Sequence, residues 1–420
     1  MKKSLFAIAA VTAFAGAAQA QSSVTVYGIL DMGYVGYNTR LAPGGTGQVT
    51  KTTGNTFTQS AESTNRLGFK GVEDLGGGTS AFFTVELGLT PANSQQAINS
   101  GATQNRQSFV GLKKNGLGDF AFGTQYTVMH NSVAASDPGN TNNMIGNLIY
   151  TAGTGASGSS GNANGDSYTI RANNSLTLNS DTFAGFKAHG LLIANNQNTT
   201  ANAPTASATA TTATITQVGG TNNQNGWGLG LDYTWNKLFV TGAMQQLKAQ
   251  NPYALTYTTA TDTITGTGAP VPFGAGQGAA LGTNVQDNQY YIAATYDFGI
   301  LKAYAQYINR KVSLQQDNNY YIKRTAQQIG VRSYITPTIE AWASGAMGKY
   351  TSFGYANPAA NLTAWQLGSN YWLSKRTNLY AIYGQVGTSN VSTLNLPNGS
   401  AANPASGNAN NYAIGVRHTF

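Results

Sequence analysis

The sequence of 420 residues has no cysteine, and only 9% of its residues are charged. Soluble globular domains usually carry about 25% charged residues, so an ordinary soluble surface is disfavoured. Without cysteine no disulfide can hold the fold, which must then rest on something more extensive, such as a large hydrogen-bonded sheet. Long apolar runs are also absent, because no stretch reaches the roughly 20 residues that a transmembrane helix needs. The 51 glycines show no three-residue period, which excludes collagen.

Aromatic residues make up 10% of the chain, and 23 of them are tyrosines. Intrinsically disordered chains are poor in aromatic residues, so disorder is disfavoured as well. The low charge content is compensated by Gly, Thr, Asn, Ser, Ala, Gln and Tyr rather than by apolar residues, and the mean hydropathy is −0.23. These features indicate an aromatic-rich all-β protein, which is either a large secreted protein or a transmembrane barrel.

The first 20 residues have the pattern of a secretory signal peptide. Lys2 and Lys3 precede the apolar stretch Leu5–Ala18, and Ala18-Gln19-Ala20 has the small-residue spacing of a cleavage site. The apolar stretch is too short to cross a bilayer. We therefore expect cleavage between Ala20 and Gln21, which leaves a barrel domain of residues 21–420. That mature chain has 21 basic and 15 acidic residues, a net charge of +6.

Strict alternation of apolar and polar residues predicts strands with two different faces. It occurs in Gly226–Trp235, in Asn288–Phe298, in the C-terminal run that ends at Phe420, and from Val24 to Met32, where Ile29 is an exception. These runs of about 10 residues suit tilted strands that cross a hydrocarbon core of roughly 30 Å. Strands of a soluble sandwich are usually shorter, about 5–6 residues. The pattern therefore favours a membrane barrel.

The segments between these strands are alternately short and long, as in outer-membrane barrels with tight periplasmic turns and longer external loops. Seven short turns and eight long loops predict a 16-stranded antiparallel transmembrane β-barrel. The short turns lie near Asp74–Gly78, Asn115–Gly118, Asn179–Phe183, Trp235–Lys237, Phe298–Ile300, Ile335–Thr338 and Ser374–Thr377. The long loops lie near Tyr37–Thr64, Pro91–Gln104, Met129–Ser167, Asn195–Asn225, Lys248–Asp287, Lys311–Ile322, Tyr350–Leu362 and Ser389–Asn410.

Several segments resemble the Gram-negative trimeric outer-membrane porin family over essentially the whole mature chain. They are SVTVYGILDMG (Ser23–Gly33), STNRLGFKGVEDLGGGTSAFFTVEL (Ser63–Leu87), RQSFVGLKKNGLGDFAFG (Arg106–Gly123), IRANNS (Ile170–Ser175) and the terminal GVRHTF. The resemblance implies a homotrimer in the outer membrane, in contact with lipid and lipopolysaccharide. It implies that the third loop, Met129–Ser167, folds into the pore, and that Phe420 is recognised by the outer-membrane assembly machinery.

Basic residues on the polar faces of strands are candidates to line the channel, because an Arg facing lipid near the bilayer centre costs about 2–4 kcal/mol. Alternation places Arg66 and Lys70 on one such face, opposite Leu67 and Phe69. Arg171 is expected on a face with Asn173 and Ser175, and Arg332 on a face opposite Ile329 and Val331.

Arg106 is also expected to face inward, but Phe109 on the same strand leaves open which residues lie on the polar face. The resemblance implies that Arg66, Arg106 and Arg171 form a basic cluster facing the third loop. It also implies a constriction role for Asp137, which is followed by Pro138. Gly123-Thr124 departs from a Gly-Arg pair frequent in the family, so the family's pore charges do not transfer as a set.

We predict a channel for passive diffusion of ions and small hydrophilic solutes that is weakly anion-selective, because rings of Arg or Lys favour anions. A substrate-specific channel on the same barrel and a surface adhesin or receptor that acts through its loops are alternatives; a soluble β-solenoid is a more distant one. Three scattered histidines and single acids give no catalytic or metal-binding spacing, so we expect no enzyme, cofactor or metal. The basic residues do not cluster in one run, which disfavours nucleic acid as a partner.

Overall fold

The computed structural model describes residues 23–43, 49–92, 104–151, 167–199, 205–209, 212–250, 253–258, 284–315, 318–319, 321–353, 360–389, 394–395, 401–402 and 405–420. The expected signal peptide, with its cleavage site at Ala20 and Gln21, lies outside this range. Among the described residues, no helix combines the length and the hydrophobicity needed to cross a membrane.

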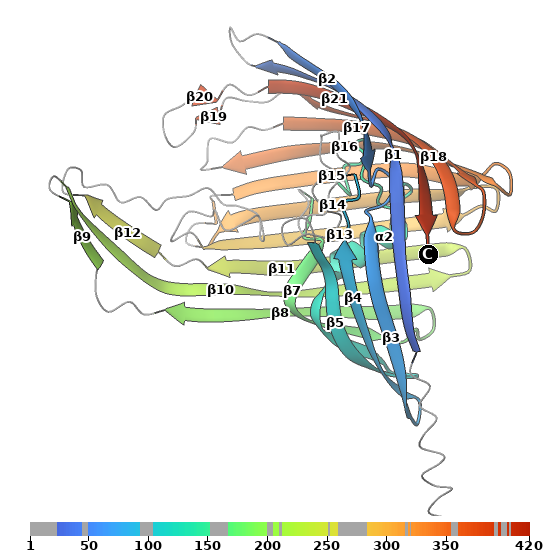
Figure 1. Ribbon diagram of the computed structural model, residues 1–420, viewed down its shortest axis with the longest axis horizontal. Helices are drawn as coiled ribbons and strands as arrows, with labels where there is room; N and C mark the ends of the chain where they lie inside the picture. Colours follow the sequence, from blue (N-terminus) through green and yellow to red (C-terminus); the bar gives the residue numbers. More distant parts are fainter. Residues whose placement is uncertain are drawn as a thin grey trace, which may run out of the picture.

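Sixteen antiparallel strands pair in a closed ring, as the alternation of turns and loops predicted (Figure 1). The ring closes because β1 pairs with β3 on one edge and with the last strand, β21, on the other. Its order is β1, β3, β4, β5, β6, β7, β8, β10, β11, β13, β14, β15, β16, β17, β18 and β21. The remaining strands extend the loops.

The ring strands are β1 (Ser23–Pro43), β3 (Arg66–Gly76), β4 (Thr79–Gly88), β5 (Gln104–Lys114), β6 (Gly118–Tyr126), β7 (Arg171–Ser180), β8 (Phe186–Thr199), β10 (Thr212–Trp235), β11 (Leu238–Gln250), β13 (Val285–Asp297), β14 (Lys302–Leu314), β15 (Tyr321–Tyr334), β16 (Ile339–Phe353), β17 (Ala360–Trp372), β18 (Thr377–Ser389) and β21 (Ala405–Thr419). The loop strands are β2 (Thr50–Gln59), β9 (Thr205–Thr209), β12 (Tyr253–Thr258), β19 (Leu394–Asn395) and β20 (Ala401–Ala402), and the helix is α2 (Val128–Ser136).

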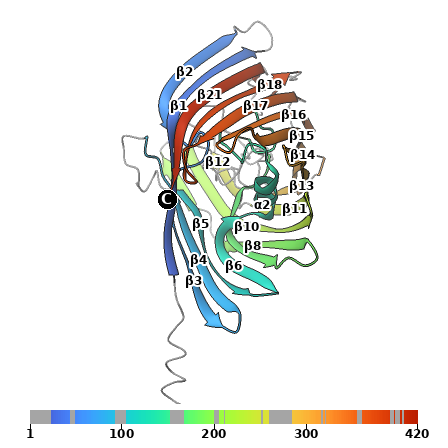
Figure 2. The ribbon, with the colours of Figure 1, turned by 90° about the vertical axis from the view of Figure 1, so that its right-hand side faces the viewer.

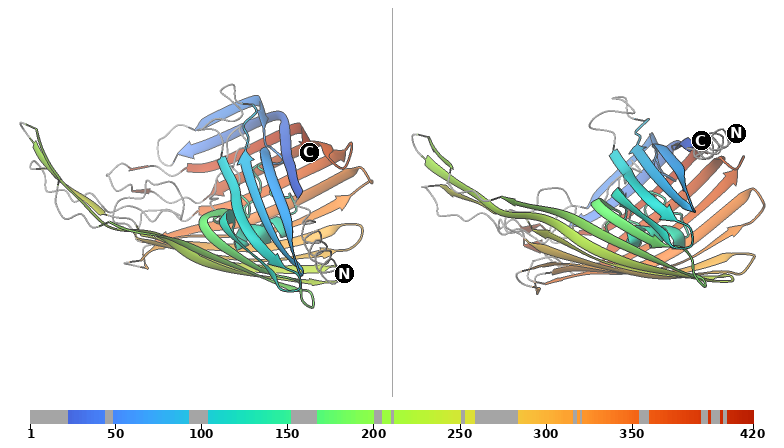
Figure 3. Two further views of the ribbon diagram at one scale, coloured as in Figure 1. Left: turned by 60° about the horizontal axis from the view of Figure 1, so that its bottom comes forward. Right: turned by 90° about the horizontal axis from the view of Figure 1, so that it is seen from below.

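Several strands continue further into the expected loops than the sequence indicated. β8 and β10 pair from Phe186 to Thr199 and from Gly220 to Tyr233, so much of the predicted loop Asn195–Asn225 is a ladder. β9 and β12 pair with the distal part of β10, and the whole hairpin reaches away from the barrel (Figure 3). Thr-rich, uncharged segments suit strands as well as loops, which explains why the boundaries were misjudged.

The two faces of each strand differ as the alternation predicted. On β13 the outward residue Ile292 is 56% exposed, whereas Gln289 and Thr295 on the inner face are almost fully buried. Leu229 and Leu231 on β10, and Ile414 and Val416 on β21, are also exposed large hydrophobic residues. Such a side chain meets lipid rather than water in a membrane barrel, so its exposure stabilises the embedded state.

The third long connection folds into the barrel, where α2 lies against the inner faces of β10, β11 and β13 (Figure 2). Thr127 caps this helix, because its hydroxyl accepts a hydrogen bond from the backbone N–H of His130. We call the described residues 127–151 and 167–170 the inner loop. Its apolar residues Met129, Val133 and Ile149 form a buried cluster with alanines and Ile308 of the barrel wall.

Neutral amides of the wall hold the inner loop in place. Gln289 accepts a hydrogen bond from the N–H of Thr169 at 2.8 Å, and Gln366 donates to the carbonyls of Met144 and Ile145 at 3.3 and 3.0 Å. Gly384 is required where Ile145 crosses β18, since a Cβ there would lie 1.7 Å from the Ile145 carbonyl oxygen. The inner loop is therefore fixed to one side of the wall.

β1 changes partner halfway along its length. Its residues up to Ile29 pair with β3, and those from Met32 onward pair with β2 on the same edge. At this gap the buried carboxylate of Asp31 accepts hydrogen bonds from the N–H groups of Glu62 and Ser63 at 2.8 and 2.6 Å. It also accepts one from the hydroxyl of Tyr380 at 2.6 Å. The side chain of Asp31 therefore supplies hydrogen bonds at the point of β1 where neither β2 nor β3 pairs with it.

Replacement of Asp31 by Ala should destabilise the barrel by about 3 kcal/mol, because two buried donors and one partly buried donor lose their acceptor and each costs about 1 kcal/mol. Tyr380→Phe removes one of these bonds and should cost about 1 kcal/mol. The midpoint of unfolding in denaturant, followed for both variants in detergent, measures the difference. Equal midpoints for the two variants would show that Asp31 does not bridge the gap.

Candidate functional site: the channel constriction

A cavity of about 310 Å³ opens between the inner loop and the wall formed by β1, β3, β5, β6 and β7. The wall contributes Arg66, Arg106 and Arg171, the three arginines that the sequence analysis grouped. The inner loop contributes neutral side chains, including Asn140, Thr141 and Tyr150. The opening therefore has one basic side and one uncharged polar side.

Arg106 is brought into the barrel by a strand irregularity. The register between β4 and β5 shifts between Glu86 and Leu87, whose partners are Gln107 and Asn105, so Arg106 is the unpaired extra residue. This shift lets Arg106 point inward although Phe109, three residues later, packs against the inward-facing Phe82. The phase that the sequence left ambiguous is thus resolved by a bulge.

Glu86 is the acidic partner of this cluster. Its carboxylate lies 2.7 Å from Nε of Arg106 and 3.8 Å from Nη1 of Arg66, and it accepts a hydrogen bond from the Tyr27 hydroxyl. Glu86 and Arg106 are buried, whereas the Arg66 side chain keeps 21% of its surface exposed. One carboxylate among three guanidinium groups leaves a net charge of +2 in this cluster.

Arg171 also lies in the cluster, but the strand around it does not follow the simple alternation that was predicted. The register between β6 and β7 shifts between Gly123 and Gln125, and Asn174 lies in the left-handed region with a φ of 51°. The shift breaks the simple alternation that placed Arg171 on the face of Asn173 and Ser175. The guanidinium of Arg171 lies 5.9 Å from the ring centre of Tyr126, whose hydroxyl accepts a hydrogen bond from Arg106 at 2.7 Å.

His130 is the imidazole of the inner loop that faces the arginines. Its Nδ1 lies 3.1 Å from the Tyr168 hydroxyl, and its ring stacks 4.3 Å from that of Tyr126. Burial and the nearby positive charge of Arg171 lower the pKa of His130 to about 3. The histidine is therefore neutral at physiological pH and adds no charge to the opening.

The structure places Asp137 and Arg332 away from the cluster. Asp137 is 2% exposed, and its carboxylate accepts hydrogen bonds from the Thr141 N–H and the Asn147 side chain. Its burial raises the pKa of this carboxyl above the usual range. Asp137 does not line the opening as expected, because it is used to fold the loop on itself.

Arg332 faces the barrel interior, as its strand phase indicated, but it supports the inner loop from behind. Nη1 of Arg332 donates to the Pro138 carbonyl at 2.7 Å, and its Nε pairs with Glu340. Lys70 follows Arg66 on β3, with its ammonium 5.4 Å from the ring centre of Tyr27. Arg66, Arg106 and Arg171 thus meet at the opening, Lys70 lies along the same wall, and Arg332 lies elsewhere.

Sequence reasoning missed several inward residues. Arg310 forms a buried ion pair with Asp287 at 2.5 Å, and Arg324 donates to the Leu148 carbonyl at 2.7 Å. The alternation in β14 and β15 could have identified both arginines. The sequence pattern does not single out Glu86, since its pairing with Arg106 depends on the bulge. The glutamines on the inner face of the wall carry no charge, so nothing in the sequence indicated that they hold the inner loop.

Phe420 lies at the end of the last strand, where its backbone exchanges two hydrogen bonds with Gly28 of β1. A side chain at position 28 has no room, since a Cβ would lie 2.3 Å from the Phe420 ring and 2.6 Å from the backbone carbonyl oxygen of Arg66. In the part of the chain that the structure describes, no group of three or more His, Cys, Asp or Glu side chains could hold a metal ion.

Comparisons with known proteins agree with this arrangement. The profile of the family described as Gram-negative porin matches residues 7–391. An outer membrane porin protein of Bordetella pertussis is 27% identical over 436 residues and covers all of both chains. Outer membrane porin protein 32 of Delftia acidovorans is 31% identical over 269 residues, which are 59% of this chain and 70% of that protein.

Solved structures show the same fold. An anion-selective porin from Comamonas acidovorans superposes with a TM-score of 0.63 at 21% identity, over 95% of this chain and all of that one. OmpT of Vibrio cholerae, in its trimer form, superposes with a TM-score of 0.58 at 15% identity, over 95% and 99% of the two chains. The Bordetella and Delftia relatives are named as outer membrane porins, and the Comamonas protein is named as a porin. With a closed barrel around a narrowed opening and a family match across nearly its whole length, the chain belongs to the Gram-negative porin family and forms an outer-membrane channel.

Proposed function

We propose that the channel passes small hydrophilic solutes passively and prefers anions. The observation that carries this proposal is the asymmetry of the opening, with three arginines on the wall and an uncharged surface on the inner loop. Within the described inner loop the only carboxylate is Asp137, and it is buried away from the opening. A passing anion therefore meets the net positive charge of the cluster, and no carboxylate of the described inner loop faces that cluster.

One solved structure supports the same preference. The Comamonas porin is named as anion-selective, and its fold superposes over 95% of this chain. Basic groups that line a pore raise the local concentration of anions and exclude cations. Because Glu86 neutralises part of the cluster, we propose a moderate rather than a strict preference.

We further propose that the functional unit is a homotrimer. The structure of OmpT in its trimer form supports this proposal through the shared fold. Channel closures in groups of three in planar bilayer recordings are the corresponding signature, and independent single closures would contradict it.

Simultaneous replacement of Arg66 and Arg171 by Ser should weaken the anion preference. Each unit charge about 4 Å from a passing ion contributes about 1 kcal/mol in a water-like medium, which is about fivefold in local concentration. The reversal potential in a salt gradient measures the change. The matched control is Arg40→Ser with Arg376→Ser, which removes the same charge at exposed sites on β1 and in a turn. An equal shift in both double variants would place the selective charges elsewhere.

His130 should not contribute to the pH dependence of selectivity above pH 5. Because its pKa is lowered to about 3, the imidazole is already neutral at pH 5 and stays neutral as the pH rises. We expect the change in reversal potential between pH 5 and pH 7.5 to be the same in the wild type and in His130→Gln. A change that His130→Gln abolishes would mean that this histidine titrates in the channel.

We also propose that export removes residues 1–20 at the Ala20–Gln21 bond and that Phe420 is recognised by the assembly machinery. Support comes from the signal-peptide pattern and from the place of Phe420 at the end of the strand that closes the ring. The outer-membrane form should have the mass of a chain that starts at Gln21, and deletion of Phe420 should lower its amount in that membrane. An intact leader, or an unchanged amount, would contradict the respective proposal.

A further inference from the structure

Residues 137–142 of the inner loop form a tight turn, which we call the tip turn. Two of its residues other than glycine have left-handed backbone conformations, with φ values of 53° at Asn140 and 52° at Thr141. Asparagine tolerates this region, but a branched side chain such as that of threonine is strained there. Such strain persists only where the surrounding structure enforces it. Both residues line the opening opposite the arginines, so the contacts that enforce their conformation also position this side of the opening.

The two ends of the tip turn are attached to different strands of the wall. Near its start, the Pro138 carbonyl accepts the hydrogen bond from Arg332 of β15. At its end, the buried amides of Asn142 and Gln366 on β17 bond to each other in both directions, at 2.6 and 3.1 Å. The residues between these two attachments are the ones that project toward the arginines.

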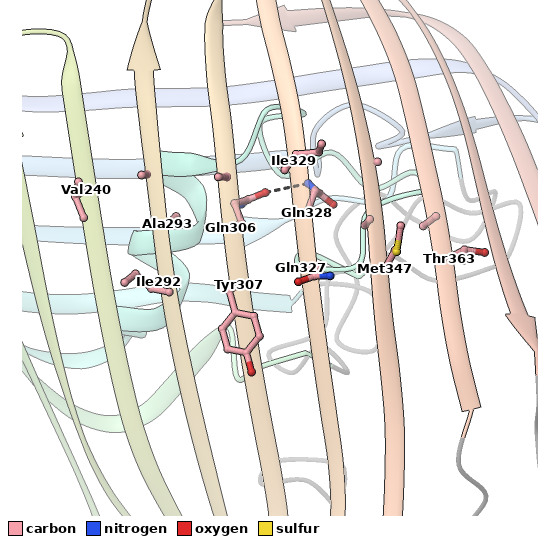
Figure 4. A pocket seen from close by; sticks show the side chains of 15 residues that line it. Val240, Ile292, Ala293, Gln306, Tyr307, Gln327, Gln328, Ile329, Met347 and Thr363 are labelled. Carbon is pink, nitrogen blue, oxygen red and sulfur yellow. Dashed lines mark hydrogen bonds between the residues drawn. The ribbon is translucent and has the colours of Figure 1, made fainter.

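Asp137 closes the tip turn from within. Its carboxylate accepts a hydrogen bond from the N–H of Thr141 at 2.7 Å, and its backbone carbonyl accepts one from the N–H of Asn140 at 3.2 Å. The same carboxylate lies 3.4 Å from the side-chain nitrogen of Gln328 on β15, which also donates to Gln306 on β14 at 3.0 Å (Figure 4). The tip turn is thus closed on itself and held to the wall as one rigid piece.

A notch in the wall receives Pro138. Gly330 on β15 forms this notch, because a Cβ added there would lie 2.6 Å from Cγ of Pro138 and 3.0 Å from its Cβ. Ordinary van der Waals contact begins at 3.4 Å, so a methyl group in the notch would displace the proline ring by about 0.8 Å, the difference between the two distances.

The direction of this displacement follows from the order of the strands. β15 lies eight strands from β5 in the ring of sixteen, so it stands on the side of the barrel opposite Arg106. A tip turn that moves away from β15 therefore moves toward the arginines. Transport through a pore depends on its diameter, so this movement would narrow the path of a solute.

We propose that Gly330 and Pro138 are positioning residues of the channel: the notch fixes how far the tip turn projects from β15, and this distance sets the width of the opening. Neither residue is charged or belongs to the lining of the opening, so both act through Asn140 and Thr141, which do. The inference rests on the proposed passive passage of solutes, but not on the preference for anions.

The variant Gly330→Ala tests this inference in the full-length folded protein, reconstituted into planar bilayers and into liposomes. Its single-channel conductance should fall, because the tip turn moves into the opening. Liposome swelling should slow more in maltose than in the smaller sugar arabinose, which a purely structural role of the glycine would not produce. The reversal potential in a salt gradient should stay the same, because no charge changes.

The matched control is Gly345→Ala on the adjacent strand β16, where an added Cβ would meet nothing within 4 Å. This variant should conduct like the wild type. The Cβ added at Gly330 would also lie 2.9 Å from the carbonyl oxygen of Ala343. Gly330→Ala is therefore repeated together with Pro138→Gly, which removes the proline ring, and in this background it should cause no further fall in conductance.

Wild-type conductance and swelling rates in Gly330→Ala would overturn the proposal. An equal fall in conductance with and without Pro138→Gly would also overturn it, because the effect would then come from the contact with Ala343. If Gly330→Ala does not fold, Pro138→Gly alone serves as the test. It should increase the fluctuations of the open-channel current, since the tip turn loses its contact in the notch, and unchanged fluctuations would contradict the inference. Failure of passive passage would appear separately, as wild-type liposomes that swell in neither sugar, and the comparison of conductances would still test the notch.

Discussion

The closed ladder of backbone hydrogen bonds is the constraint on which the rest of this molecule depends. Within hydrocarbon no water can pair with backbone N–H and C=O groups, so a sheet in the membrane must have no free edge. The ring meets this condition by pairing β1 with both β3 and β21, and the backbone of Phe420 continues the contact at Gly28. The residues that seal this junction, above all Asp31, are therefore as much part of the membrane wall as the strands themselves.

Closure also explains how the opening is built. A ring of sixteen strands is wide enough to hold water, so an inward segment can narrow it without filling it. The inner loop packs its apolar residues against wall alanines and leaves polar groups toward the arginines. The charged side of the opening belongs to the rigid wall, and the neutral side belongs to the loop. This division keeps the guanidinium groups in place, because their partners Glu86 and Tyr126 are themselves strand residues.

Alternation in the sequence predicted the number of strands, their faces and the closed barrel, because each strand has one lipid side and one water side. It also predicted that Arg66 faces the interior. It could not predict the two register shifts, and these bring Arg106 and Arg171 to the opening. Asp137 was misplaced for a related reason: a carboxylate in a loop can satisfy its own backbone as readily as it faces a channel, and only the packed loop decides between them. The strand extensions beyond the membrane were missed because uncharged Thr-rich segments are compatible with either state.

The attachment of the inner loop through glutamine and asparagine side chains has a consequence for the response of the channel to salt. Dissolved ions screen interactions between charges but leave hydrogen bonds between neutral amides almost unaffected. The contacts of Gln289 and Gln366 therefore hold the loop at the same position in dilute and in concentrated salt. Arg324 and Arg332 also hold the loop, but they donate to its neutral carbonyl groups and not to opposite charges. The width of the channel therefore depends on contacts that do not join two charges, whereas the preference for ion sign fades as the ionic strength rises.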